Sequence, residues 1–169
     1  MNKITSTEWA EKVAVFNVVP AQDSVQYLRM ASAEEFGELI GIFAKALRKG
    51  TIDTDPIDAA HVIEEIGDVL WSRMQLWKIE SLRPIELYDF GHSTWLEGEM
   101  YMQKWRTFQS QRSVADFLMN ATVTGITIPS LLSIANHFNA TPADVLSANV
   151  SKLQARLDSG TLDALRRPE

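Results

Sequence analysis

Apolar residues recur at helical spacing along most of the chain, and typical helix-capping residues mark the ends of these stretches. Between residues 23 and 49, intervals of three and four residues separate the members of one apolar stripe, Phe36, Ile40, Phe43 and Leu47. Gly50 follows this stretch and is a typical C-terminal stop, because glycine adopts a left-handed backbone at little steric cost. The pattern predicts a long amphipathic helix over about 23–49.

Two further helices are predicted on either side of this one. The first runs from about 8 to 19, with Ser6 or Thr7 as its N-cap. The other begins at Asp55-Pro56, with the aspartate as N-cap and the proline at the first helical position. This second helix carries an apolar stripe of Ile63, Ile66, Leu70, Met74 and Trp77.

The C-terminal part of the chain repeats the same signals. Thr141-Pro142, with Asp144 at the third position after the cap, predicts a helix that ends by Gly160. Its apolar stripe consists of Leu146, Val150, Leu153 and Leu157. These segments predict an all-α helical bundle.

The stretch from about 80 to 128 has a less regular pattern. Thr94 is a candidate N-cap for a helix that contains the aromatic residues Tyr101, Trp105 and Phe108. A further short helix is expected to begin near Ser113. Residues 121–128 form the one β-like run that we identify in the chain.

Composition places the chain among ordinary globular proteins and excludes several kinds of chemistry. Its 169 residues, 46% hydrophobic and 22% charged, predict one domain over 1–169 with a real core. The net charge of −6 argues against nucleic acid as the main partner. The absence of cysteine excludes disulfides, thiolate metal sites and cysteine nucleophiles. Without a secretory leader or a membrane-spanning apolar run, a cytoplasmic protein with no membrane partner is expected.

Two carboxylate pairs have neighbours that are unusual for a solvated helix face. Glu35 and Glu38 share one face of the 23–49 helix, and Glu65 and Asp68 share one face of the next helix. His61 lies on the same face as the second pair. Both pairs lie among apolar residues rather than among the lysines or arginines that usually neutralise exposed acids. This pattern predicts a partly buried edge that faces another helix.

Four carboxylates that meet at such an edge would repel one another strongly in a low dielectric. A divalent cation would offset this repulsion, and ligands that are all oxygen suit Mg²⁺ or Mn²⁺ better than zinc. The alternative from spacing alone is that these are exposed acids on amphipathic helices, a common arrangement.

The same residues resemble a known family, the all-α MazG-like nucleoside triphosphate pyrophosphohydrolases, with their dimeric dUTPase and phosphoribosyl-ATP pyrophosphohydrolase relatives. The family pattern Glu-Glu-x-x-Glu is met by residues 34–38, Glu-Glu-Phe-Gly-Glu, and its Glu-x-x-Asp by residues 65–68, Glu-Ile-Gly-Asp. Residues 149–156, Asn-Val-Ser-Lys-Leu-Gln-Ala-Arg, resemble the terminal Asn-x-x-Lys-Leu-x-x-Arg segment. The resemblance covers residues 8–79 and 129–160.

The resemblance implies Mg²⁺-dependent cleavage of a (d)NTP between its α and β phosphates, which yields the monophosphate and pyrophosphate. It implies that Glu34 orients or deprotonates the attacking water. The metal ligands would be Glu35, Glu38, Glu65 and Asp68. This division of labour is chemically coherent, because metal ions neutralise phosphate charge and an adjacent carboxylate positions the water.

Two further sets of residues would then contact the substrate. Candidates for the phosphate tail are Asn149, Lys152 and Arg156 on one face of the last helix, with Lys45 and Lys49 as weaker ones. Weak candidates for the base are Trp9, Phe16, Asn17 and Trp71, each of which could equally be a core residue. His61 is expected to support Glu65 through a hydrogen bond.

The chain departs from compact members of the family in the middle. About fifty residues, from roughly 80 to 128, separate the acid-bearing helix from the terminal motif, against about 2–8 in a typical bundle connection. We expect this insert to add helices that cover the site or form a subunit interface. By analogy with the family, a homodimer or homotetramer is expected.

Two other functions fit parts of the sequence. Residues 131–146 resemble the end of a helix-turn-helix DNA-binding domain, although no basic recognition helix accompanies them. A non-catalytic helical adaptor is the second alternative, against which the complete acid set argues.

Overall fold

The computed structural model describes residues 3–14, 22–79, 85–88, 95–96, 106–124 and 126–160. Helices make up most of these ranges, together with three short strands. In chain order the elements are β1 (Lys3–Thr5), α1 (Ser6–Ala14), α2 (Ser24–Lys49), α3 (Ala59–Ile79), β2 (Ile85–Tyr88), β3 (Trp95–Leu96), α4 (Gln111–Thr124), α5 (Ile128–His137) and α6 (Pro142–Asp158).

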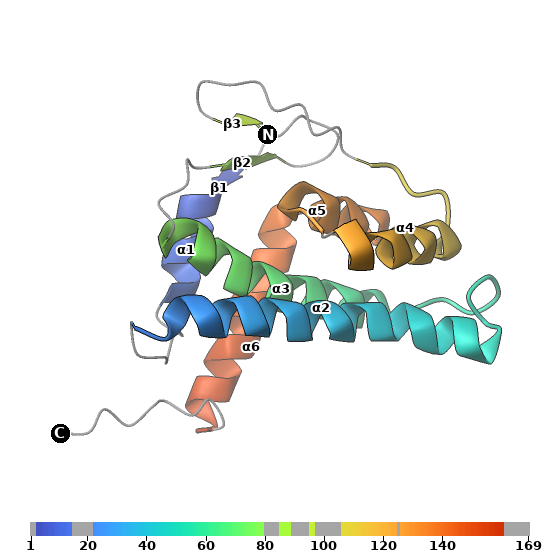
Figure 1. The fold of residues 1–169 in the computed structure, drawn as a ribbon, viewed down its shortest axis with the longest axis horizontal. Coiled ribbons are helices and arrows are strands. Elements are labelled where there is room, and N and C mark those ends of the chain that lie inside the picture. Colours follow the sequence, from blue (N-terminus) through green and yellow to red (C-terminus); the bar gives the residue numbers. More distant parts are fainter. Residues whose placement is uncertain are drawn as a thin grey trace.

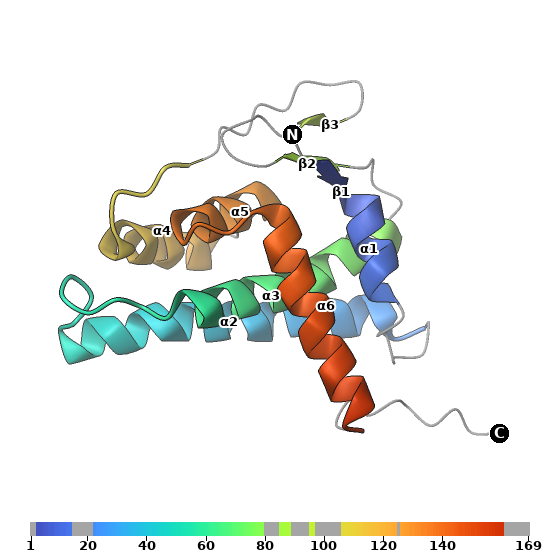
Figure 2. The same ribbon diagram turned by 180° about the vertical axis from the view of Figure 1, so that it is seen from behind.

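Helix α3 lies at the centre of this arrangement. Helix α2 runs antiparallel beside it, nearest the viewer in Figure 1. Helix α6 crosses α3 on the opposite side and is nearest the viewer in Figure 2. Helices α4 and α5 lie on the same side of this pair, with α5 over its middle and α4 toward the end at which α2 finishes, and α1 packs against α3 at the other end. The predicted helical bundle is confirmed for the described residues.

The core follows the predicted apolar stripe of α3 closely and that of α2 only in part, because Leu28 and Leu39 are fully buried on α2 while Phe36 and Ile40 are half-buried. Ile66, Leu70 and Met74 of α3 are fully buried and belong to one apolar cluster with residues of the five other helices. This central position explains why α3 is apolar over most of its circumference. Leu47 and Leu157, the last members of the stripes on α2 and α6, lie at helix ends and are exposed.

The ends of the first two helices show how local caps set helix boundaries. Helix α2 matches the predicted range, and Gly50 closes it with a φ of 72°. The predicted caps of α1, Ser6 and Thr7, are wrong. The side chain of Thr5 accepts a hydrogen bond from the backbone N–H of Glu8 (3.1 Å), while the Glu8 carboxylate accepts one from the Thr5 N–H (2.6 Å). The predicted residues 15–19 of this helix lie outside the described ranges.

The predicted start of α3 at Asp55-Pro56 is also wrong. The helix begins at Ala59, and Asp58 caps it by accepting hydrogen bonds from the backbone N–H groups of Ala60 (3.0 Å) and His61 (3.4 Å). The segment before Asp58 stays non-helical because a tertiary contact, described next, competes for its backbone groups.

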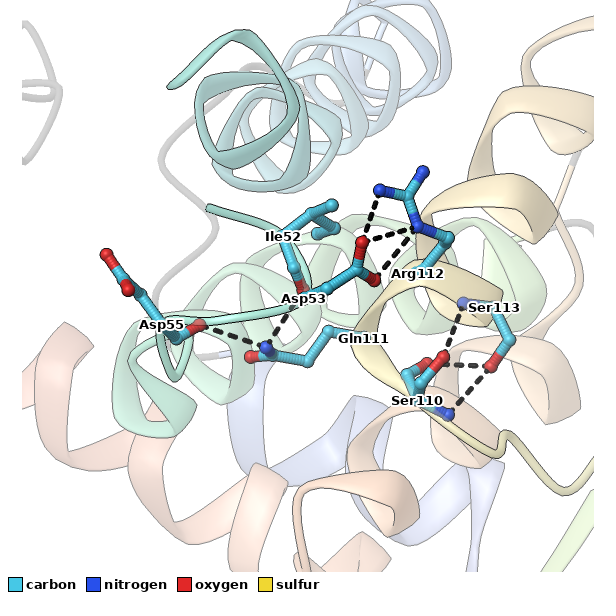
Figure 3. Close-up of polar contacts among 7 residues, drawn as sticks. All are labelled: Ile52, Asp53, Asp55, Ser110, Gln111, Arg112 and Ser113. Carbon is cyan, nitrogen blue, oxygen red and sulfur yellow. Dashed lines mark hydrogen bonds and ion pairs between the residues drawn. The ribbon is translucent and has the colours of Figure 1, made fainter. Parts of the chain in front are cut away.

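Polar side chains of α4 hold the loop between α2 and α3 (Figure 3). The amide of Gln111 donates to the carbonyl oxygens of Ile52 (3.3 Å) and Asp55 (3.0 Å). The guanidinium of Arg112 binds both carboxylate oxygens of Asp53, at 2.5 to 3.0 Å. A helix capped by Asp55 would use the Asp55 carbonyl for its own first hydrogen bond, so the contact between this carbonyl and Gln111 favours the later start.

The middle of the chain differs most from the predictions. Three short strands form an antiparallel sheet in the order β1-β2-β3, so the part of the 80–128 insert that the structure describes is not entirely helical. Trp95 lies in β3, which contradicts a helix capped by Thr94. Phe108 precedes α4 and is not helical, and Tyr101 and Trp105 lie outside the described residues.

The predicted β-like run at 121–128 is wrong. Helix α4 begins at Gln111, two residues before the expected start, and continues to Thr124. Helix α5 then begins at Ile128, with Thr127 as its N-cap and Pro129 in its first turn. Burial of Ala121 and Ile126 in the helical core outweighs the β-propensity of this short stretch.

Helix α6 has the predicted start. The Thr141 side chain accepts from the backbone N–H of Asp144 (3.2 Å), and the Asp144 carboxylate accepts from the Thr141 N–H (2.9 Å), so the cap is reciprocal.

Because this cap holds the N-terminus of α6, Thr141→Ala is expected to lower the free energy of unfolding by about 1 kcal/mol. Thr141→Ser retains the hydroxyl and should restore most of this loss. Urea denaturation measures both values. Equal stabilities of the Ala and Ser variants would contradict the assignment.

Candidate metal centre

Three glutamates from two helices come together at the edge between α2 and α3. Oxygen atoms of Glu35 and Glu38 on α2 and of Glu65 on α3 all lie within 4.8 Å of one another. The three-residue spacing places the first two one turn apart on α2, and the antiparallel packing of α3 brings Glu65 opposite them. The convergence that the sequence predicts is therefore present for three of the four acids.

Glu65 is the most deeply buried member of this cluster, with 4% of its surface exposed. Its Oε1 lies 3.4 Å from Nδ1 of His61, one turn earlier on α3, as expected for a supporting histidine. Its Oε2 is buried and has no hydrogen-bond partner among the residues that the structure describes. Burial raises the pKa of Glu65, because desolvation penalises the charged carboxylate. An unpartnered oxygen at this depth is unfavourable unless a further group binds it.

Glu35 shows the electrostatic cost of this arrangement most clearly. Burial and the negative charges of Asp68, Glu38 and Glu65 raise its pKa from 4.5 to about 7. A bound cation would reverse this effect by stabilising the ionised carboxylate.

Asp68 lies near this cluster but is engaged elsewhere. Its Oδ1 accepts a hydrogen bond from Nδ2 of Asn149 (2.9 Å), and its Oδ2 lies 2.5 Å from Nζ of Lys152. Both partners are on α6. The predicted fourth ligand therefore joins α3 to α6 in this structure and is not among the three acids that meet within 4.8 Å.

Lys152 also contacts a second acid, Glu64, at 3.2 Å from Nζ to Oε1. Burial alone would lower the pKa of the Lys152 ammonium, but its bonds to Asp68 and Glu64 raise it above the ordinary value. Burial raises the pKa of Asp68, against the opposing effect of Lys152. Lys152 therefore supplies the positive charge nearest to Asp68.

Gly67 makes the close approach of α6 sterically feasible. A Cβ atom at this position would lie 3.0 Å from Cβ of Asn149, which is itself fully buried. A side chain here would push α6 away from α3. In the sequence, Glu64 and Gly67 belong only to a string that resembles the family, and neither was assigned a role. Only the tertiary contact shows what these two residues do.

The other predicted phosphate contacts occupy different environments. Asn149 is fully buried against Asp68, with its Oδ1 unpartnered, so its amide is not open to solvent. Arg156 is exposed on α6, and its charge acts on the Asp68 carboxylate. Glu34 and Lys45 are exposed on α2, as is Lys49 at its end. The structure thus brings Asn149 and Lys152 to Asp68.

Of the four predicted base-binding residues, Trp9 and Trp71 lie in the described part of the chain, and both contribute to the apolar core. Trp9 is fully buried in α1, and its Nε1 has no hydrogen-bond partner. Trp71 is partly buried, donates from Nε1 to the Val13 carbonyl (3.4 Å) and contacts Tyr27 edge-on. Phe16 and Asn17 lie outside the described residues.

Comparisons with protein-family models, curated proteins and solved structures found no match. Within the described part of the chain, no helix combines the length and the apolar character needed to cross a membrane. The function proposed below is therefore based on the geometry of the acid cluster and on the sequence resemblance.

The raised pKa of Glu35 predicts a pH-dependent stability in the presence of a chelator. The folded state retains a proton between about pH 4.5 and 7 that the unfolded chain releases, so the free energy of unfolding falls as the pH rises through this window. Glu35→Gln removes this contribution and should give a shallower fall. Denaturation between pH 4 and 8 measures the difference, with Glu11→Gln, an exposed acid on α1, as the control. Equal slopes for wild type and Glu35→Gln would contradict the assignment.

The tight contact at Gly67 gives a second prediction. Gly67→Ala is expected to lower the free energy of unfolding by about 1–3 kcal/mol, because the added methyl overpacks a buried helix contact. Gly37→Ala is the control, since a Cβ there meets no atom within 4 Å and alanine favours a helix. The control should be neutral or stabilising. A stabilising Gly67→Ala would show that α6 accommodates the methyl without cost.

Proposed function

We propose that this protein is a Mg²⁺-dependent nucleoside triphosphate pyrophosphohydrolase that cleaves a (d)NTP between the α and β phosphates. The observation that carries the proposal is the convergence of Glu35, Glu38 and Glu65 within 4.8 Å, with one buried Glu65 oxygen unpartnered. The choice of reaction rests on the resemblance of residues 34–38, 65–68 and 149–156 to the MazG-like family.

The residues fit the metal that the reaction requires. The three side chains offer only carboxylate oxygens, which hard cations such as Mg²⁺ or Mn²⁺ prefer. The raised pKa of Glu35 and the unpartnered Glu65 oxygen both indicate negative charge that the nearby Lys152 ammonium compensates only in part. Glu35, Glu38 and Glu65 would hold the ion, and Asp68 is close enough to act on Glu35 electrostatically. A bound Mg²⁺ supplies charge neutralisation for the phosphate oxygens.

The chain's own residues would complete the chemistry. Glu34 precedes Glu35 on α2 and is exposed, so its carboxylate is free to orient or accept a proton from an attacking water. Lys152 and Arg156 place two cations on α6 near Asp68, where they would favour the anionic phosphate tail. Trp9, Phe16, Asn17 and Trp71 are the proposed contacts for the base.

The helix-turn-helix alternative is less compatible with the arrangement of α6. A recognition helix needs a free polar face to enter a groove, whereas Asn149 and Lys152 bind Asp68 of α3. The proposal retains a homodimer or homotetramer, by analogy with the family that the sequence resembles.

Incubation with Mg²⁺ and a panel of nucleoside triphosphates, followed by assay of released pyrophosphate, tests the proposal. Glu38→Gln is expected to lower kcat/KM by roughly 100-fold or more through loss of a metal ligand. Its Tm in chelator should equal or exceed that of wild type, because one repelling charge is removed. Glu11→Gln should leave both values unchanged. Failure of the wild type to release pyrophosphate from any nucleotide would favour the non-catalytic adaptor.

A further inference from the structure

The two oxygens of Asp68 are both occupied by side chains of α6. Oδ1 accepts from Asn149 and Oδ2 is bound by Lys152, whose own side chain is 17% exposed. Asp68 nevertheless lies one turn from Glu65 on α3, and its charge is the largest electrostatic influence on Glu35. A carboxylate beside a three-acid cluster is thus neutralised by an internal ammonium group.

The cluster itself has no such partner for its most buried oxygen. Oε2 of Glu65 is unpartnered, although the residue is only 4% exposed. A divalent cation bound there would attract the neighbouring Asp68 carboxylate, because the attraction between opposite charges increases at short range and in partly buried surroundings. Lys152 and the cation would then repel each other, since both are positive and both are drawn to the same oxygen.

We propose that Lys152 competes with the divalent cation for Asp68, so that metal binding releases the Lys152 ammonium from this carboxylate. The inference rests on the proposed function, because it concerns the same metal centre. Lys152 serves as a stand-in cation that neutralises Asp68 before the metal binds, and Asn149 keeps the other oxygen of Asp68 in place.

The structure also provides a second position for the released ammonium. Glu64 lies 3.2 Å from Nζ of Lys152, and its side chain is 41% exposed. Lys152 can therefore leave Asp68 without losing every acidic partner, and from this more exposed position its charge is available to a phosphate group of the substrate. The exchange conserves charge pairing on both sides: the metal takes the place of Lys152 at Asp68, and Lys152 retains Glu64.

The test is the affinity of the metal alone, without nucleotide or turnover. Titration with Mn²⁺, followed by the EPR signal of the free ion, gives the Kd of the wild type. In Lys152→Met, loss of the competing cation should lower this Kd by about five- to tenfold, because Asp68 is left without its positive partner. Lys152→Arg keeps the charge and should remain within about twofold of wild type. Lys78→Met, which removes an exposed lysine from the end of α3, is the control and should match wild type.

An unchanged or weaker Kd for Lys152→Met would overturn the competition while leaving the metal centre and the proposed function intact. Absence of Mn²⁺ binding by wild type and all variants would overturn both proposals together.

A second measurement needs no variant, so poor folding of a variant cannot affect it. In wild type, the NMR signal of the Lys152 ε-methylene group should shift on addition of Mg²⁺, while that of Lys78 should not. A Lys152 signal that does not respond to saturating Mg²⁺ would also overturn the competition.

Discussion

The contact between Asp68 of α3 and the polar side chains of α6 determines how the charged residues of this protein are arranged. A carboxylate buried between two helices is costly unless it is paired and hydrogen-bonded, and α6 supplies both an amide and an ammonium group. Gly67 allows the helices to come close enough for these bonds to form. The cap at Thr141 and the packing of Leu153 fix α6 in the corresponding position.

The same edge of α3 carries a second group of acids whose charge is not matched in this way. Glu35, Glu38 and Glu65 meet closely, with His61 next to Glu65 and the Lys152 ammonium of α6 acting on Glu35 and Glu65 electrostatically. The charge of Asp68 is thus neutralised by its partners on α6, whereas the three glutamates have an excess of negative charge. Such an imbalance reduces the stability of a protein and is typical of sites that bind a ligand. It gives the proposed metal centre a physical basis independent of the family resemblance.

Capping residues in the sequence predicted helix ends correctly where the cap lies within the same helical turn as the groups it binds. The boundaries of α2 and α6 follow from Gly50 and from the Thr141–Asp144 pair, which act within one helical turn. The start of α3 could not be predicted in this way, because Gln111, more than fifty residues away, binds the backbone of the preceding loop. The strand at Trp95 likewise depends on pairing with β2, a partner that no local pattern specifies.

The helical character of the chain, its apolar stripes and its two acid pairs on helix faces follow from the order of the amino acids alone. These features depend on spacing along one helix, which is fixed by its 3.6-residue period. Which acids meet one another depends instead on how the helices pack. Asp68 lies next to the three glutamates but binds Asn149 and Lys152, because the angle at which α6 crosses α3 depends on packing contacts between residues far apart in the chain.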